Sequence, residues 1–402
     1  MFCFQWIQML NLAKLASQMR HAAFDFREEA SLFDGRRALV RQTWNGALLQ
    51  EASLVEKLLQ AKDFPWGSAR PLEPLNHRAA LPDLAPQHIV LATDGSQIVP
   101  SRHEISPCYL VNIGRIRYLY GTGERPLQES EPFLYHREQD LYTQVRRQFV
   151  GVSEQWIGLE RGLKEFEELA ELCVETRRLW PERPVLAMID GSLTGLLPEL
   201  MALPQTLQMT AFKRLAGAFN QIRSQGIPLC AYISQSRRTE VINFLRLQRC
   251  PYERPTCETL CTEGQEPCSG LAPFPDRQLW QDILDLGERS PLFTPLATTP
   301  EPLQGHELCF FYLHCGAEVA RIEIPRWVAD RPEWLMAVHG YVFSQVEKGR
   351  GYPIALAEAH NQAVVKSSDR AQFYALLSRK LADAQIGIQV SRKELKKRRG
   401  IV

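Results

Sequence analysis

Two short apolar runs that each end in Asp-Gly-Ser constrain the fold of this 402-residue chain more than any other feature. The first is HIVLATDGS at residues 88–96, and the second is VLAMIDGS at residues 185–192. Short apolar runs bounded by turn residues are typical of buried strands. A long, charged, helix-like stretch separates the two runs, so we expect a mixed α/β domain with a single sheet rather than a regular doubly wound repeat.

The remaining patterns place further elements around these two strands. Alternating or apolar runs predict strands in CYLVNIGRIRYLYGTGE, IPLCAYISQS and ELCFFYLHCGAEVARIEIP. Apolar spacing of three and four predicts helix over residues 1–62, and further helical segments are expected at 136–179, 207–225, 333–348 and 354–382. The expected organisation is a helical N-terminal arm (1–62), a Pro-rich connector (63–87), a main α/β domain (88–382) with a Cys-rich insertion (250–270), and a basic tail (383–402).

Charge and hydropathy limit the classes of function. The formal net charge is +1, so the overall charge does not indicate a nucleic-acid-binding protein. The end SRKELKKRRGIV is basic and reads either as a solvated tail or as an arm that attracts phosphate. The N-terminus is a poor signal peptide. No apolar run reaches the roughly 18 residues that a membrane span needs, so we expect a cytoplasmic protein with no membrane partner.

The two strand-end aspartates, Asp94 and Asp190, are the candidate functional carboxylates. Each could simply close an Asx-type turn. Two identical sites favour a shared role instead, because carboxylates at the ends of neighbouring strands can bind one divalent cation such as Mg²⁺ or Mn²⁺.

Such an aspartate pair usually takes a third acidic ligand, which the helix WIGLERGLKEFEELAELCVE could supply. Glu167 lies nearest its apolar face, with Glu171 and Glu160 on the same flank and Glu168 on the opposite side. We expect Glu167, and after it Glu171, to reach the site; the alternative is a solvated helix face.

Four cysteines lie close together in the insertion CPYERPTCETLCTEGQEPC: Cys250, Cys257, Cys261 and Cys268. Four thiols within so short a stretch predict one tetrahedral site, with structural Zn²⁺ as the first reading and an iron–sulfur cluster as the second. Free thiols in a loop are the alternative. The other six cysteines lie mostly in apolar segments and are expected in the core.

The order of these motifs resembles the NurA nucleases, and in detail their bacterial branch. The resemblance rests on Asp-Gly-Ser after one strand, a Glu-bearing helix, Asp-Gly-Ser-Leu after a second strand, then AYISQSRRTEVINFLR and GYPIALAEAHNQAVV. These motifs occur in order over residues 88–375.

The resemblance implies a fold similar to RNase H and Piwi domains. It implies Mn²⁺-dependent DNA cleavage with 5′ to 3′ exonuclease and single-strand endonuclease modes. It also implies a homodimer that acts in DNA end processing and repair with a hexameric HerA-type ATPase. Asp94 and Asp190 match the family's metal-binding aspartates, and Tyr352 and His360 match its C-terminal tyrosine and histidine. Archaeal members have a lysine near AYIS, where this chain has Gln235 and Ser236.

Several neighbouring residues could assist at such a site. Arg237 or Arg238 would take the role of the missing lysine and grip phosphate, unless they lie in a solvated loop. His360 could bind metal or move a proton, or it could be a surface residue. The pair Tyr232 and Ser234 could line the same cleft or serve strand packing.

Two other functions compete with a nuclease: a non-catalytic DNA-binding or scaffold subunit of the same fold, and a metal-dependent hydrolase of a different substrate.

Overall fold

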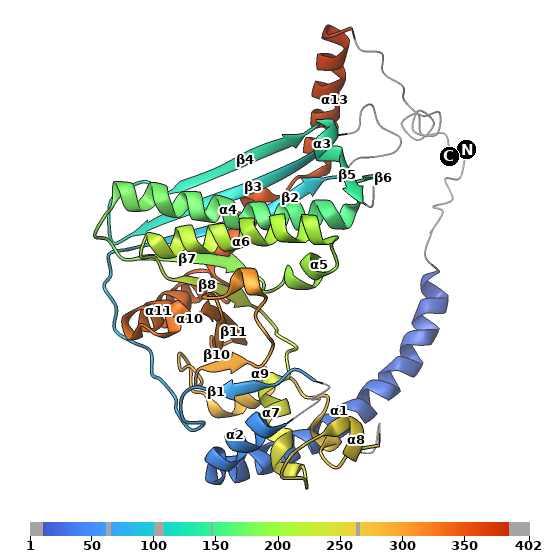
Figure 1. Ribbon diagram of the computed structural model, residues 1–402, viewed down its shortest axis with the longest axis vertical. Coiled ribbons are helices and arrows are strands. Elements are labelled where there is room, and N and C mark those ends of the chain that lie inside the picture. The colour runs from blue at the N-terminus through green and yellow to red at the C-terminus, as the bar shows by residue number, and fades with distance from the viewer. Residues whose placement is uncertain (1–10, 62–65, 100–107, 146–147, 263–265, 386–402) are drawn as a thin grey trace, which may run out of the picture. The chain divides into compact units, whose positions relative to one another are not determined.

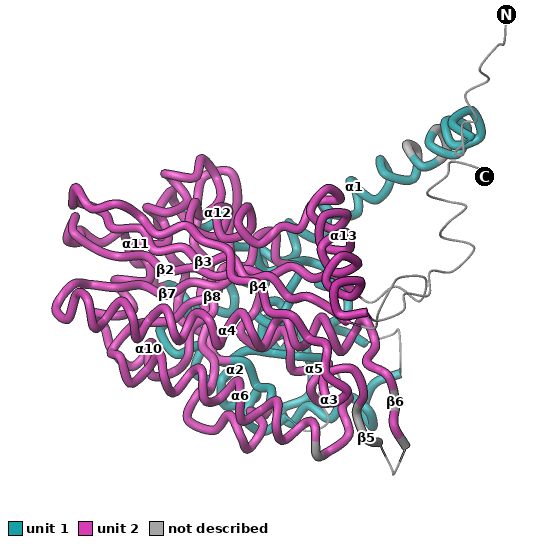
Figure 2. Tube along the Cα trace, turned by 90° about the horizontal axis from the view of Figure 1, so that it is seen from above, with its two compact units in different colours: residues 1–76, 237–283, 295–297 teal, residues 77–236, 284–294, 298–402 magenta. Residues whose placement is uncertain are grey.

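The computed structural model describes residues 11–61, 66–99, 108–145, 148–262 and 266–385. Two compact units divide the chain (Figure 2). Unit 1 comprises residues 1–76, 237–283 and 295–297, and unit 2 comprises the rest. Most of the predicted basic tail, and Cys3, lie outside the described residues.

Unit 2 contains a mixed sheet with the strand order β9-β10-β11-β8-β7-β2-β3-β4 (Figure 1). The neighbours β2, β7 and β8 are parallel, whereas β3, β4, β10 and β11 pair in antiparallel fashion. The strands are β2 (His88–Ile98), β3 (Tyr109–Tyr120), β4 (Leu127–Tyr135), β7 (Val185–Asp190), β8 (Leu229–Ile233), β9 (Phe293–Pro295), β10 (Leu308–His314) and β11 (Val319–Pro325). This confirms the predicted mixed α/β class with helices flanking a sheet.

The parallel strands form because their apolar runs are buried on both faces. Ile89 to Ala92 in β2 and Leu186 to Met188 in β7 have no exposed surface. Near-continuous apolar sequence is what a parallel strand covered on both sides requires. The two runs that opened the sequence analysis therefore become adjacent central strands.

Two helices cover opposite faces of β2 and β3. Asp94 pairs with Gly114 across these strands, so Gly95 points to the other face. At Gly114 a Cβ atom would collide with the carbonyl of Ala359 in the helix α12 (Ile354–Ala363). At Gly95 a Cβ atom would meet side chains of α4 (Glu154–Leu179). The two glycines thus allow close packing of one helix on each face.

The other elements of unit 2 flank this core (Figure 1). They are α3 (Glu138–Leu141), β5 (Tyr142–Val145), β6 (Gln148–Gly151), α5 (Leu197–Met201), α6 (Gln205–Ser224), η2 (Glu301–Leu303), α10 (Arg326–Ala329), α11 (Pro332–Lys348) and α13 (Ser367–Asp383). Within the residues that the structure describes, no helix has the length and apolarity needed to cross a membrane.

Unit 1 joins N-terminal helices to the segment 237–283. Its elements are α1 (Leu12–Leu49), α2 (Glu51–Gln60), β1 (Ala69–Pro71), α7 (Glu240–Arg249), α8 (Cys257–Leu260), η1 (Ser269–Leu271) and α9 (Asp276–Ile283). Trp44 of α1 packs edge-on against Trp280 of α9 at 5.2 Å between ring centroids. Buried Asp276 caps α7 by accepting from the backbone N–H groups of Val241 and Ile242 at 3.1 and 2.9 Å.

The structure differs from the predicted elements in two places. Residues 136–179 were expected as one helical region, but the hairpin β5–β6 lies within them. The predicted helix 354–382 is broken between α12 and α13, where the side chains of Ser96 and Asn112 donate to the carbonyl of Ala363. The Ala363 carbonyl thereby accepts hydrogen bonds from strand side chains instead of from a backbone N–H of a further helical turn.

The compact units also cut across the expected organisation. Residues 237–283, which include the Cys-rich insertion, group with the N-terminal helices instead of with the rest of the expected main domain.

Candidate active site

Asp94 and Asp190 lie side by side at one edge of the sheet. Strands β2 and β7 are parallel, and their register pairs Thr93 with Ile189, the residues just before the two aspartates. Parallel neighbours bring their carboxyl ends to the same edge, so both acids emerge there. Asp190 is exposed and Asp94 is partly buried.

A third carboxylate, that of Glu165 in α4, lies close to both. The Thr93 hydroxyl donates to the carbonyl oxygen of Glu165 at 2.9 Å, which fixes α4 against β2. Because Gly95 has no Cβ, the Glu165 side chain fits beside it; a Cβ there would lie 2.6 Å from Glu165 Oε1.

Burial raises the pKa of Glu165 to about 8. The guanidinium of Arg161, whose Nε lies 3.2 Å from Glu165 Oε1, opposes this rise, while the charges of Asp94 and Asp190 add to it. The three carboxylates therefore influence one another electrostatically.

The glutamates favoured from sequence point elsewhere. Glu167 and Glu160 accept from Arg214 of α6, with shortest contacts of 2.6 Å each. Glu171 accepts from the amide of Gln221 at 3.4 Å. Helix α4 packs against both α6 and β2. A glutamate close to the apolar face of α4 can therefore point toward α6 instead of toward the strand ends.

Sequence reasoning missed Glu165, and no local pattern distinguishes it from the other glutamates of α4. Its partners, Thr93 and Gly95, are distant in the chain.

His360 and Tyr352 join the aspartates at this edge. His360, in the last turn of α12, has Nδ1 2.8 Å from Asp94 Oδ2, and its side chain is 67% exposed. Burial raises the pKa of the Tyr352 hydroxyl, and the nearby charges of Asp190 and Asp94 raise it further. The structure thus brings together four residues named from sequence.

The loop after β8 is held by Glu318. This buried carboxylate accepts from the Tyr232 hydroxyl and the Ser234 hydroxyl at 2.7 Å each, and from the backbone N–H of Gln235 at 3.0 Å. The Tyr232 ring meets the Tyr352 ring edge-on at 5.5 Å. Tyr232 and Ser234 therefore lie next to the tyrosine of the site, with their hydroxyls already engaged.

Arg237 and Arg238 directly follow this loop. Both are exposed, and both belong to unit 1.

The second Asp-Gly-Ser is held from β11. Glu323 accepts from the Ser192 hydroxyl at 2.7 Å and from the backbone N–H of Leu193 at 3.1 Å. Its other oxygen accepts from Arg321 Nε at 2.9 Å, and both side chains of this ion pair are buried. Sequence reasoning did not single out Glu318 or Glu323, although both are charged residues in or beside a strongly apolar strand.

The donor set suits a hard divalent cation. In the described part of the chain, no three His, Cys, Asp or Glu side chains are already arranged around one metal position. The buried Oε1 of Glu165 has Arg161 Nε at 3.2 Å but makes no hydrogen bond with it, and the Glu165 carboxylate is near two others. Clustered, under-neutralised carboxylates fit Mg²⁺ or Mn²⁺. Asp94, Asp190, Glu165 and His360 are the residues that could hold the ion.

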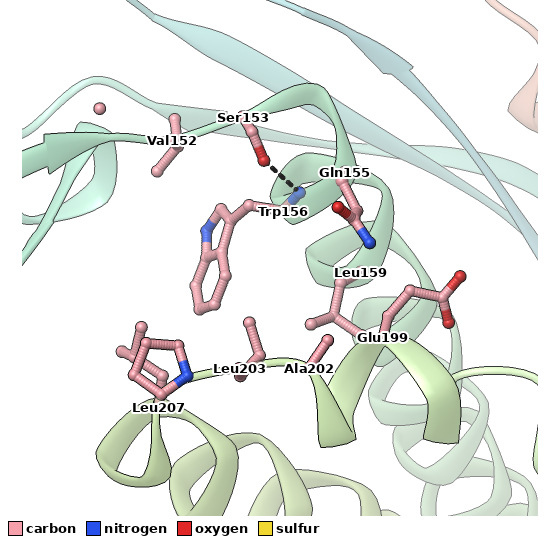
Figure 3. A pocket seen from close by; sticks show the side chains of 11 residues that line it. Val152, Ser153, Gln155, Trp156, Leu159, Glu199, Ala202, Leu203 and Leu207 are labelled. Atoms are coloured by element: carbon pink, nitrogen blue, oxygen red, sulfur yellow. Dashed lines mark hydrogen bonds between the residues drawn. The ribbon is translucent and has the colours of Figure 1, made fainter. Parts of the chain in front are cut away.

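A separate cavity of about 200 Å³ lies between the start of α4 and the α5–α6 connection (Figure 3). Trp156, Leu159, Leu203 and Leu207 are among its lining residues, and Ser153 caps α4 beside it by accepting from the Trp156 N–H at 3.1 Å. None of the carboxylate-site residues lines this cavity, so the candidate chemistry lies outside it.

Fold and site together define a mixed α/β protein with a carboxylate cluster, a histidine and a tyrosine at the carboxyl edge of its parallel strands. The model of the NurA domain family matches residues 88–365, more than half of the chain. The chain belongs to the NurA domain family.

Solved structures of this kind resemble the chain at low identity. The NurA nuclease from Sulfolobus solfataricus is 14% identical with a TM-score of 0.45, covering 85% of this chain and 95% of that chain. NurA with manganese is 10% identical with a TM-score of 0.37, covering 75% and 90%. NurA bound to dAMP and manganese is 11% identical with a TM-score of 0.35, with the same coverage. Among curated proteins there is no significant match.

Proposed function

We propose that this NurA-domain protein is a divalent-metal-dependent DNA nuclease. The observation that carries the proposal is the cluster of Asp94, Asp190 and Glu165 at the sheet edge, with His360 on Asp94. Membership of the NurA domain family supports DNA as the substrate. The modes of cleavage are 5′ to 3′ exonuclease and single-strand endonuclease, as the resemblance implies.

The metal ion, Mn²⁺ or Mg²⁺, would activate water and stabilise charge on the phosphate when bound. Asp94, Asp190 and Glu165 supply its oxygen ligands, with Glu165 taking the place first assigned to Glu167 and Glu171. His360 is oriented by Asp94 through Nδ1, which leaves Nε2 to exchange a proton. Neutral Tyr352 donates a hydrogen bond at the same edge.

The residues after β8 would contact the DNA backbone. Arg237 and Arg238 are exposed cations that can pair with phosphate. Ser234, held by Glu318, is exposed beside them, whereas Tyr232 is fully buried in β8 and supports the Tyr352 ring from behind instead of contacting DNA. The four-cysteine site predicted to hold Zn²⁺ or an iron–sulfur cluster belongs to unit 1 and takes no part in this chemistry.

The biological setting that we propose follows from the family. The protein would act in the cytoplasm in DNA end processing and repair, as a homodimer with a hexameric HerA-type ATPase. Light scattering of the purified chain would then give twice the monomer mass of 46.0 kDa.

The test is degradation of end-labelled DNA with Mn²⁺, Mg²⁺ or EDTA. Asp94→Asn, Asp190→Asn and Glu165→Gln should each reduce Mn²⁺-dependent cleavage by at least roughly 10–100-fold. That is the loss seen when a residue that only orients a metal ligand is changed. Glu167→Gln is the matched control on the same helix and should retain cleavage, because its carboxylate pairs with Arg214.

Other outcomes separate the rival functions. Cleavage that survives both aspartate substitutions places the chemistry elsewhere. DNA binding without cleavage in any metal favours a non-catalytic DNA-binding or scaffold subunit. Faster hydrolysis of small phosphoesters than of oligonucleotides favours a hydrolase with a different substrate.

A further inference from the structure

The four cysteines of the 250–268 segment converge on one small cavity in unit 1. Cys250 follows α7, Cys257 begins α8, Cys261 follows α8, and Cys268 precedes η1. All four are free, and all four line the same cavity. By contrast, the described cysteines outside this segment are each buried in unit 2, which confirms their expected place in the core.

The size of this cavity limits what it can hold. Its volume is about 10 Å³, close to the roughly 10–15 Å³ that one water-sized probe occupies. A cluster of several iron and sulfide atoms needs far more room, whereas a single ion bound to four thiolates at about 2.3 Å does not. The volume therefore favours one ion over an iron–sulfur cluster.

A buried cation at the same cavity lacks a counter-charge. Arg246 also lines the cavity, is only 7% exposed, and stacks its guanidinium 3.5 Å above the Trp66 ring. Its Nε has no hydrogen-bond partner, and no carboxylate pairs with it among the described residues. Burying an unpaired charge is costly. Four thiolates around a divalent ion carry a net charge of −2, which would compensate Arg246.

Binding an ion would require the four sulfurs to move. They are not already arranged around one metal position, so binding would draw them toward the cavity that all four cysteines line.

We propose that Cys250, Cys257, Cys261 and Cys268 together bind one structural Zn²⁺ ion, with Arg246 as its buried counter-charge. The ion closes the 250–268 segment at the end of α7. Lys57 of α2 donates to the Cys250 carbonyl at 2.6 Å, so the ion also strengthens the join between this segment and the N-terminal helices of unit 1. The proposal does not depend on nuclease activity.

The experiment measures the metal content of the purified full-length chain by elemental mass spectrometry. About one zinc per chain is expected, released when an organomercurial blocks the thiols. Cys257→Ser and Cys261→Ser should lose the zinc and unfold at lower temperature. Cys173→Ala, which removes a thiol of α4, and Thr259→Ala, an exposed change between the two ligands, should keep it.

Two further variants locate the ion. Asp94→Asn with Asp190→Asn should keep the zinc, which separates this site from the carboxylates. Arg246→Gln should keep the fold but weaken zinc binding roughly 10–100-fold, the usual effect of a supporting residue. If the cysteine variants fail to fold, Co²⁺ exchanged into the wild-type protein should still give the visible spectrum of tetrahedral thiolate ligation.

Three results would overturn the proposal. One is a folded wild-type chain without metal whose four thiols react freely. Another is iron with acid-labile sulfide in place of zinc. The third is zinc that disappears with the aspartates and stays when the cysteines are changed.

Discussion

Glu165 is a carboxylate of the site whose environment differs strongly from that of an exposed side chain. An exposed glutamate titrates near 4.3, whereas burial raises the pKa of Glu165 to about 8 and the nearby charges of Asp94 and Asp190 add to the rise. Around neutral pH without metal, the Glu165 carboxyl is therefore mostly protonated. A divalent cation would reverse this by favouring ionised Glu165.

The metal-free protein should lose stability as pH rises from about 5 to 8. Folded Glu165 binds its proton more tightly than the unfolded chain does, so its contribution is fully present at low pH and is lost toward the folded pKa. The loss is on the order of 1.4 kcal/mol per pH unit between the two pKa values. Thermal unfolding in EDTA across this pH range would measure it.

Glu165→Gln should flatten this pH dependence, and Mn²⁺ should stabilise the wild type more at pH 8 than at pH 5. Glu167→Gln is the control and should keep the wild-type slope. Equal slopes in wild type and Glu165→Gln would show that Glu165 titrates normally.

At the scale of elements, the site depends on how closely two helices approach the sheet. Helix α4 delivers Glu165 past Gly95, and α12 delivers His360 past Gly114 on the opposite face. Both approaches need a residue without a Cβ. Two glutamates then hold the loops: Glu323 of β11 holds the turn after β7, and Glu318, just before β11, holds the loop after β8.

Gly95→Ala should destabilise the fold and weaken metal-dependent cleavage together. Its Cβ would lie 2.6 Å from Glu165 Oε1 and 2.7 Å from Arg161 Cγ. Overpacking of this kind costs typically about 1–3 kcal/mol. Chemical denaturation measures the first effect and DNA cleavage with Mn²⁺ the second.

Gly123→Ala is the matched control, because nothing lies within 4 Å of a Cβ at that position. It should leave both properties unchanged. A Gly95→Ala protein as stable and as active as this control would contradict the close packing of α4 on β2.

At the scale of the whole molecule, the N-terminal helices are part of a compact unit. Helices α1 and α2 contact α7. In α1, Phe33 stacks on Phe274 at 5.0 Å, and Trp44 packs edge-on against Trp280 at 5.2 Å. Helices α1 and α2 therefore complete a core with α7 and α9, and they do more than form a free arm.

A chain lacking residues 1–60 should lose protection from hydrogen exchange in α7 and α9 while keeping it in β2 and β7. The deletion removes Phe33 and Trp44, whose rings pack against Phe274 and Trp280, whereas the strands keep their own neighbours. Hydrogen exchange resolved by peptide would show the contrast. Unchanged protection in α7 would mean that residues 237–283 fold independently of the N-terminal helices.

Much of the sheet and the meeting of the two strand-end aspartates follow from sequence. The apolar runs before Asp94 and Asp190 predict buried strands, and the paired Asp-Gly-Ser predicts that the two carboxylates meet. GYPIALAEAH identifies Tyr352 and His360 by resemblance. The hairpin within residues 142–151 could not be predicted in the same way, because its polar residues lie inside a stretch that reads as one helix.

The sequence by itself determined which segments become central strands, since burial leaves a local mark on hydrophobicity. Only the tertiary structure decided which glutamate joins the aspartates, where α12 ends, and which segments share a core. Each of these depends on contacts between residues far apart in the chain: Thr93 with Glu165 across 72 positions, and Ser96 with Ala363 across 267. The rotation of a helix against a sheet is set by such contacts, and a helix's own periodicity cannot specify it.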